Sequence, residues 1–149
     1  MEIATEVTIA ASSATVWRIL ADVERYPQWN PYIRELHGKL ALGEAIRFRF
    51  ALAGDITLPA KARVLTVAIE RELDWAGHLL SERLFRAEHY HRLEPISGRS
   101  TRLQHGERFS GALAVLLWPF LRAWGPGRYR ATNLALKQRA EALTPQEQP

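Results

Sequence analysis

Three histidines and a glutamate are the residues of this sequence whose types and spacing suit proton transfer or ligand binding. His89 and His91 are two positions apart, and so are His105 and Glu107. Side chains alternate between the two faces of a β-strand, so each pair lies on one face of its own strand. A turn-forming segment between the pairs predicts an antiparallel hairpin over residues 84–109, with all four side chains on its apolar, inward face.

The register of this hairpin decides which of the four side chains meet. If Leu93 pairs with Leu103, His91 lies opposite His105, and the remaining histidine lies opposite the glutamate, with about 5 Å between facing side chains. A slip of two residues would separate these pairs but keep them on the same face. The other face carries alternating arginines and glutamates together with Tyr90, and we expect it to be solvated.

Three interpretations of this histidine/glutamate group follow from its chemistry. Imidazole and carboxylate are ligands for zinc or iron, but a His-x-His spacing on a strand is common, and we expect no metal ion and no other cofactor. A histidine oriented by Glu107 could move protons on an enolisable, polyketide-like substrate, because histidine titrates near neutral pH. The interpretation that we favour is a polar patch that orients a ligand or is satisfied by water. Whether any of the four is catalytic stays open.

The same interior is expected to contain aromatic side chains and one amide. Burying polar groups unpaired would cost about 1 to 3 kcal/mol each, so we expect a ligand cavity around the histidines. Aromatic residues on the expected inner faces, and an asparagine on the apolar stripe of the last helix, are its candidate walls. The expected ligand-binding residues are therefore Trp29, Phe48, Phe50, Trp75, His89, His91, His105, Glu107, Tyr129 and Asn133.

The elements that must position these residues begin with a strand at 2–10. Ser12 is placed to cap a short helix that ends near Val23. Two prolines in the segment 26–31 prevent this helix from continuing, although a second short helical turn fits there. Further strands are expected before the hairpin, at 33–41, 44–52, 58–69 and 72–78.

Three breaks in the pattern predict local irregularities. In the 58–69 strand the apolar residues change faces, which indicates a β-bulge. Gly77 is expected to open the turn that follows its strand. Pro119 and the Gly-Pro-Gly segment 125–127 are expected to end an apolar run, so that the C-terminal helix begins at Arg128.

Together these elements predict an α+β fold: a curved antiparallel seven-stranded sheet around a long C-terminal helix, with two short helices after the first strand. Strands with short connections favour antiparallel pairing, because parallel neighbours need long crossovers. The C-terminal helix must bury its apolar stripe, and the concave face of the sheet is its available partner. We expect one domain over residues 1–143 and a polar tail at 144–149.

The composition excludes several functions. The chain of 149 residues has no cysteine, which excludes disulfides, thiolate catalysis and cysteine-bound zinc. Its net charge of +4 comes from scattered arginines rather than from a basic cluster, so we expect no nucleic-acid partner. The apolar run is shorter than the roughly 20 residues that span a bilayer, so we expect no stable membrane insertion.

Two further expectations concern assembly and location. The apolar segment 112–124 could mediate a homodimer, cover the mouth of the cavity as a flexible gate or touch a membrane surface, since an exposed apolar patch needs such an explanation. The N-terminus starts directly with a strand and lacks the basic start and apolar core of a secretion signal, so we expect a cytoplasmic protein.

Several segments of the chain resemble the START-like (SRPBCC) superfamily with the helix-grip fold, in particular its polyketide cyclase/dehydrase-like and lipid-transport group. They are Ser12–Trp17, Leu20–Asp22 with Tyr26–Pro31, Leu73–Gly77, Gly106–Gly111 and Asn133–Lys137. These are mostly capping, turn and packing residues, so they specify the fold more than the function. The resemblance implies a small apolar or aromatic molecule bound between helix and sheet. Some members of the superfamily cyclise polyketides, some carry lipids or quinones, some sense hormones and some regulate chaperones.

We therefore expect a protein that binds a hydrophobic or aromatic small molecule, lipid-, quinone- or polyketide-like, between the sheet and the C-terminal helix. One alternative is a polyketide cyclase or aromatase that uses the histidine/glutamate group as acid and base. A second alternative is a regulator that docks on a protein partner through its apolar segment.

Overall fold

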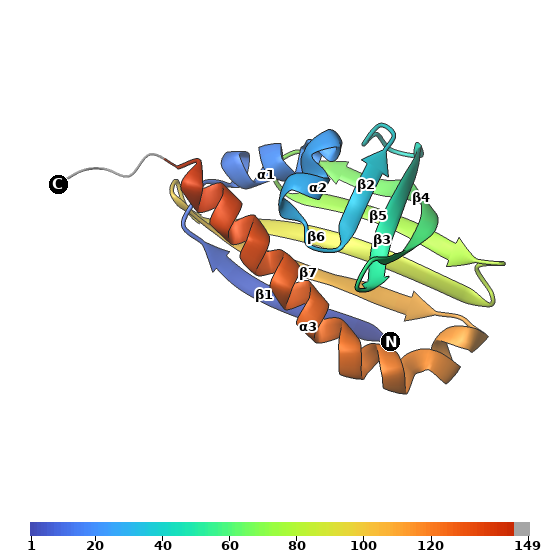
Figure 1. The fold of residues 1–149 in the computed structure, drawn as a ribbon. Coiled ribbons are helices and arrows are strands. Elements are labelled where there is room, and N and C mark those ends of the chain that lie inside the picture. Colours follow the sequence, from blue (N-terminus) through green and yellow to red (C-terminus); the bar gives the residue numbers. More distant parts are fainter. Residues whose placement is uncertain (145–149) are drawn as a thin grey trace.

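The computed structural model describes residues 1–144, which form one antiparallel sheet and one long helix, with short helices after the first strand (Figure 1). The sheet has seven strands in the order β1-β7-β6-β5-β4-β3-β2, which confirms the predicted fold class. Apart from Thr144, the predicted polar tail lies outside the described residues. The elements are β1 Glu2–Ile9, α1 Ser13–Ala21, a 3₁₀ turn Val23–Arg25, α2 Tyr26–Trp29, β2 Ile33–His37, β3 Ala45–Ala53, β4 Ile56–Ala68, β5 Glu72–Leu79, β6 Phe85–Ser97, β7 Ser100–Ser110 and α3 Ala112–Ala142.

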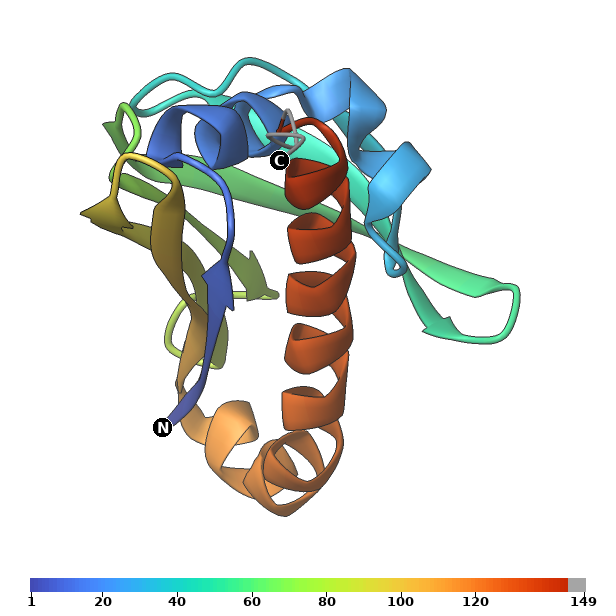
Figure 2. The same ribbon diagram turned by 90° about the vertical axis from the view of Figure 1, so that its left-hand side faces the viewer.

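The sheet curls around α3. Figures 1 and 2 show α3 crossing the concave side of the sheet, with α1 and α2 covering the end where α3 finishes. The main hydrophobic core lies at this covered end, where buried side chains of α1, α2 and the sheet meet Leu136 and Ala140 of α3. A smaller cluster at the other end joins Ile3, Phe109 and Ala114. The sheet and α3 are therefore packed together most extensively at one end.

The short helices form where the sequence provides their caps. Ser12 is the N-cap of α1, and its Oγ accepts a hydrogen bond from the backbone N–H of Thr15 at 3.2 Å. Pro27 lies in the first turn of α2, where its missing N–H costs no helical hydrogen bond. Asn30 then accepts two backbone N–H bonds with its side-chain oxygen, which turns the chain into β2.

β4 contains the predicted bulge. Its pairing with β5 shifts between Val64 and Thr66. Ala62 and Val64 lie in the main core before the shift, and Val67 packs against the same core after it. Because a bulge inserts one residue into a strand, the inward positions change from even to odd numbers. The strand thus keeps apolar side chains toward the core on both sides of the bulge.

The predicted break in the C-terminal helix is wrong. α3 is continuous and contains both Pro119 and Pro126. A proline removes one backbone donor and its ring pushes against the preceding turn, which can bend a helix without ending it. The first turns of α3 indeed run at an angle to the rest (Figures 1 and 2). Gly125 lies within the helix where α3 approaches β1, and a β-carbon there would meet the end of the Ile3 side chain, which would have to shift.

Two strand details also differ from the prediction. β2 ends at His37, well before its predicted end, because Gly38 leaves the strand with a φ of +123°. Gly77 lies inside β5 and is paired on both sides rather than opening a turn. A β-carbon at Gly77 would stand 2.7 Å from the carbonyl oxygen of Lys61, so here too the glycine permits a close approach.

The outer face of the β6–β7 hairpin is charged as expected, but Tyr90 on this face is buried. Its ring lies against Gly106 and beneath the guanidinium groups of Arg92 and Arg108, which are 4.7 and 5.0 Å from the ring centre. Its hydroxyl donates a hydrogen bond to Glu2 at 2.9 Å. The expectation of a solvated face is therefore wrong at this residue, because long arginine side chains cover the ring.

The first turns of α3 expose apolar side chains. Val115, Leu116 and Phe120 are 65%, 74% and 59% exposed. Within residues 1–144 no helix combines the length and apolar character needed to cross a membrane. A homodimer or a protein partner at this segment stays a prediction.

Candidate functional site

A cavity of about 970 Å³ lies between the concave face of the sheet and α3. Its walls are mostly aromatic and aliphatic side chains from the sheet and from α3. Polar side chains line it on the β6–β7 hairpin and on the facing turns of α3, and charged side chains of β2 to β4 line it as well, among them Glu35, Arg47, Arg49 and Lys61. The residues that line it include Phe48, Phe50, Trp75, Ala87, His89, His91, His105, Glu107, Arg128 and Tyr129.

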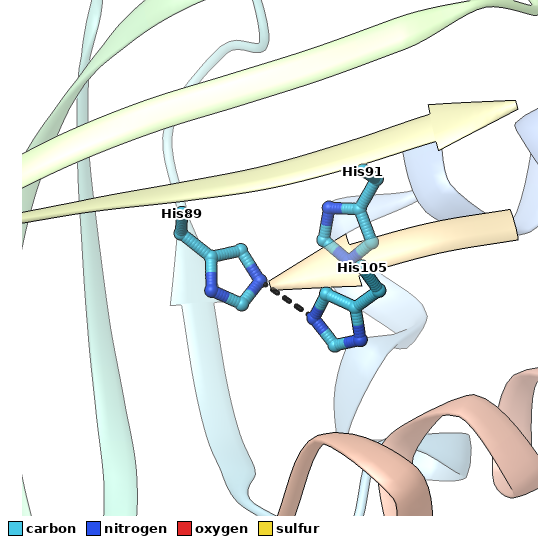
Figure 3. A group of neighbouring side chains, drawn as sticks. All are labelled: His89, His91 and His105. Carbon is cyan, nitrogen blue, oxygen red and sulfur yellow. Dashed lines mark hydrogen bonds between the residues drawn. The ribbon is translucent and has the colours of Figure 1, made fainter. Parts of the chain in front are cut away.

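The hairpin brings the three histidines together, as Figure 3 shows. β6 and β7 pair with His91 opposite His105 and His89 opposite Glu107. The Nε2 atoms of His89 and His105 are 3.0 Å apart and share a hydrogen bond. The rings of His91 and His105 are stacked, with centres 4.4 Å apart and 11° between their planes. Of the two registers that the sequence left open, the hairpin therefore has the one in which Leu93 pairs with Leu103.

His105 is held from its other side by α3 and β1. Its Nδ1 lies 2.6 Å from Oδ1 of Asn133, and both residues are buried. Asn133 in turn donates from Nδ2 to Oγ1 of Thr5 at 2.9 Å. The Thr5 hydroxyl donates to the backbone carbonyl of His105 at 2.8 Å, so the three residues form a closed cycle of hydrogen bonds. A residue of the first strand and a residue of the last helix therefore fix the orientation of one imidazole on β7.

Burial keeps the three imidazoles neutral. It lowers the pKa of His105 to about 4 and the pKa of His89 and His91 well below the usual value. Neighbouring histidines lower the pKa of His89 and His91 further, because a second positive charge in the same pocket would repel the first. At neutral pH each ring therefore has one N–H donor and one bare nitrogen acceptor.

Glu107 shows the opposite shift. Burial raises its pKa to about 7, although the hydrogen bond that it accepts from the Tyr129 hydroxyl opposes this rise. Burial and the Glu107 carboxylate raise the pKa of Tyr129 well above its usual value, so Tyr129 stays a neutral donor. Near neutral pH the site thus pairs a carboxyl group that readily gains or loses a proton with neutral imidazoles.

The three histidines are close enough to share a metal ion, with ring nitrogens within 4.8 Å of one another. Their orientations fit such an ion poorly. Imidazole lone pairs lie in the ring plane, and the nearly parallel, stacked planes of His91 and His105 do not aim at a common point. His89 and His105 already share a hydrogen bond between their Nε2 atoms. The rings would have to rotate to ligate a metal, and its expected absence stays a prediction.

The structure places most, but not all, of the other predicted site residues at the cavity. Trp75 stacks on His89, with ring centres 4.9 Å apart and 16° between the planes. Trp29 packs on Tyr26 in the main core and does not line the cavity. Asn133 also lies outside the wall and acts on the cavity through the imidazole that it holds. The remaining predicted residues on the wall are Phe48, Phe50 and Tyr129.

Arg128 lines the cavity but was not predicted as a site residue; the sequence marked it only as the expected first residue of the C-terminal helix. The guanidinium of Arg128 lies over the rings of Tyr32 and Trp124, 3.8 and 4.1 Å from their centres. It donates hydrogen bonds to the backbone carbonyls of Ala51 and Leu52, and burial lowers its pKa. Its helical spacing, four and eight residues before buried positions of α3, was the signal that could have identified it.

The fold and this site define a class of protein: a helix-grip domain with a cavity of ligand size between sheet and helix. The family model described as "Polyketide cyclase / dehydrase and lipid transport" matches residues 1–141. The chain therefore belongs to this family, and the predicted membership of the START-like (SRPBCC) superfamily is confirmed. Family membership makes it a ligand-binding protein of the START-like type.

Solved structures share this fold. A START superfamily protein from Mycobacterium smegmatis has a TM-score of 0.78 and 24% identity, over 96% of this chain and 99% of that chain. A protein from Thermus thermophilus has a TM-score of 0.74 and 17% identity, over 97% and 100%. The Zhui aromatase/cyclase from Streptomyces sp. R1128 has a TM-score of 0.72 and 19% identity, over 95% and 93%. At such identities these similarities show the fold alone, and no curated protein matches the chain.

Proposed function

We propose that this protein binds a hydrophobic or aromatic small molecule, lipid-, quinone- or polyketide-like, in the cavity between the sheet and α3. The observation that carries the proposal is the cavity itself. Its volume of about 970 Å³ and its mainly apolar wall are typical of small-molecule sites. A ligand would restore the contacts that wall side chains such as Phe48, Phe50 and Trp75 lack where they border open space.

A substitution that fills the cavity tests this proposal. Ala87 lines the cavity, whereas Ala45 is an exposed residue of β3 and provides a matched control. We expect Ala87→Trp to weaken the binding of a naphthalene probe about tenfold or more, and Ala45→Trp to leave it unchanged. Isothermal titration calorimetry measures both affinities. Equal affinities for the wild type and both variants would contradict binding in this cavity.

A polyketide cyclase or aromatase is the second candidate, and one specific observation favours it. Glu107, with a pKa raised to about 7, faces the neutral His89 across the strands, which places an acid and a base side by side at the cavity. Such a pair could remove and return a proton beside a carbonyl group, the step that begins an aldol cyclisation.

Proton exchange distinguishes an enzyme from a carrier. An enzyme should speed the exchange of the α-protons of an aryl ketone such as 1-tetralone in heavy water, measured by NMR. Glu107→Gln should abolish this acceleration while the affinity for the ketone changes little. No acceleration by the wild-type protein, despite binding of the ketone, would leave the carrier function alone.

A further inference from the structure

The hydrogen bonds around His105 have directions that can be assigned from one end. The Thr5 hydroxyl must donate to the backbone carbonyl of His105, because a carbonyl only accepts. Its oxygen therefore accepts from Asn133, which must present its amide nitrogen to Thr5. The other atom of that amide, Oδ1, then faces Nδ1 of His105, so Nδ1 carries the hydrogen.

The tautomer of His105 in turn determines the tautomer of His89. A neutral His105 with its hydrogen on Nδ1 has a bare Nε2, which can only accept a hydrogen bond. Its partner at 3.0 Å is Nε2 of His89, which must therefore carry the hydrogen of that ring. His89 is neutral as well, so its Nδ1 is a bare acceptor. The amide of Asn133 thus sets the polarity of a ring that it does not touch.

This bare nitrogen is available to a ligand. Figure 3 shows the second ring nitrogen of His89 on the side away from His105. No residue in the described part of the chain donates a hydrogen bond to it, and His89 lines the cavity. Trp75 stacks on one face of the ring and keeps it in place. A ligand that reaches this nitrogen must bring a donor.

We infer that the cavity selects aromatic molecules carrying a hydroxyl donor, a phenol or an enol, whose O–H bonds to Nδ1 of His89. Thr5, Asn133 and His105 are positioning residues in this recognition, because they hold His89 in the accepting tautomer. This inference rests on the proposed binding function and names the chemical group that the site would favour. A ketone or an ether, which only accepts, would leave the nitrogen unpaired and bind more weakly.

A matched pair of probes tests the inference. 2-Naphthol and 2-methoxynaphthalene share their rings, but only the first has an O–H. At about pH 8 the imidazoles are neutral and Glu107 is mostly ionised, so the polarity of the site is defined. We expect 2-naphthol to bind about five- to tenfold more tightly in calorimetric titrations. Equal binding of both probes would overturn the inference and leave the proposed function intact, whereas binding of neither would overturn both.

The variant Asn133→Asp should reverse the polarity. A buried carboxylate beside Nδ1 would favour a charged His105 that donates from both nitrogens, so His89 would accept at Nε2 and carry its hydrogen on Nδ1. The preference for 2-naphthol should then be lost or inverted. Lys137→Gln is the control on the same helix: Lys137 bonds to Thr8 and Glu141, outside the histidine chain, and its loss should preserve the preference.

Nitrogen NMR of the histidine rings measures the tautomers directly and does not depend on whether the aspartate variant folds. In the wild-type protein we expect the hydrogen on Nδ1 of His105 and on Nε2 of His89. A hydrogen on Nδ1 of His89 in the wild-type protein would overturn the inference, whatever the probes show.

Discussion

The β6–β7 hairpin has a packed end and a hollow end, although the two strands pair in one register along both. At the packed end Leu93 faces Leu103 within the main core. Two residues further along each strand, His91 faces His105, and the next inward pair is a histidine and a glutamate that line the cavity. Over three successive inward-facing pairs, the interior beside the hairpin therefore changes from close packing to an open cavity.

What covers each end explains the difference. α1 and α2 lie over the packed end and fill the space between sheet and α3 with side chains such as Val16, Leu20 and Tyr26. Over the hollow end α3 crosses the sheet and presents Arg128 and Tyr129 to the cavity. Stability and binding are thus separated along one hairpin, and the following substitutions test this separation.

The largest effect is expected at the packed end. Leu103→Ala should lower the free energy of unfolding by about 2 to 5 kcal/mol, because it removes fully buried methyl groups and leaves a void. Phe50→Ala at the hollow end should cost less, since that ring is only half-buried and borders the cavity. Urea denaturation measures both changes. Equal losses would remove the distinction between the two ends.

The next effect concerns Glu107 and depends on pH. Its pKa is raised to about 7 in the folded protein, so the folded state holds a proton that the unfolded state has lost at neutral pH. The ordinary pKa of a glutamate is 4.5, so the Glu107 contribution to the free energy of unfolding falls as the pH rises from 4.5 to about 7. Above that pH the contribution is lost completely. Glu107→Gln should be more stable than the wild type at about pH 8, by up to about 3 kcal/mol, and similar to it at about pH 4.

Thermal or urea unfolding of both proteins across this pH range gives the difference, and the histidine contributions cancel because both proteins contain them. A difference that stays constant with pH would mean that Glu107 titrates normally in the folded protein.

The smallest effect separates two histidines of the same pair. His105→Phe should cost about 2 kcal/mol, because it leaves Asn133 and His89 without their hydrogen-bond partner. His91→Phe should cost less, about 1 kcal/mol, since it removes an interaction with the backbone of Leu73 but leaves the hydrogen bonds from Asn133 through His105 to His89 in place, and a phenyl ring can keep the stacking. Urea denaturation of both variants provides the test. A larger loss for His91→Phe would show that the histidine chain is not what holds this end together.

The hairpin was predictable because its signal is local. The two-residue alternation of His89 and His91 was sufficient for the inward face, whereas the pairing of Leu93 with Leu103 was one of two registers that the sequence left open. The N-cap at Ser12 and the face change in β4 were predictable for the same reason, since each depends on neighbouring residues. Trp29 was expected at the cavity wall but lies in the main core. Aromatic character alone does not distinguish a core residue from a wall residue.

The sequence by itself determined the α+β class, the strand faces and the group of histidines with Glu107, because alternation, capping and turns act over a few residues. Only the tertiary structure decided what those residues meet. Gly125 of α3 lies against Ile3 of β1, and Asn133 orients the imidazole of His105 while it also bonds to Thr5. The contacts of Ile3 with Gly125 and of Thr5 with Asn133 join residues more than a hundred positions apart, and they follow from how the sheet curls around the helix rather than from any local pattern.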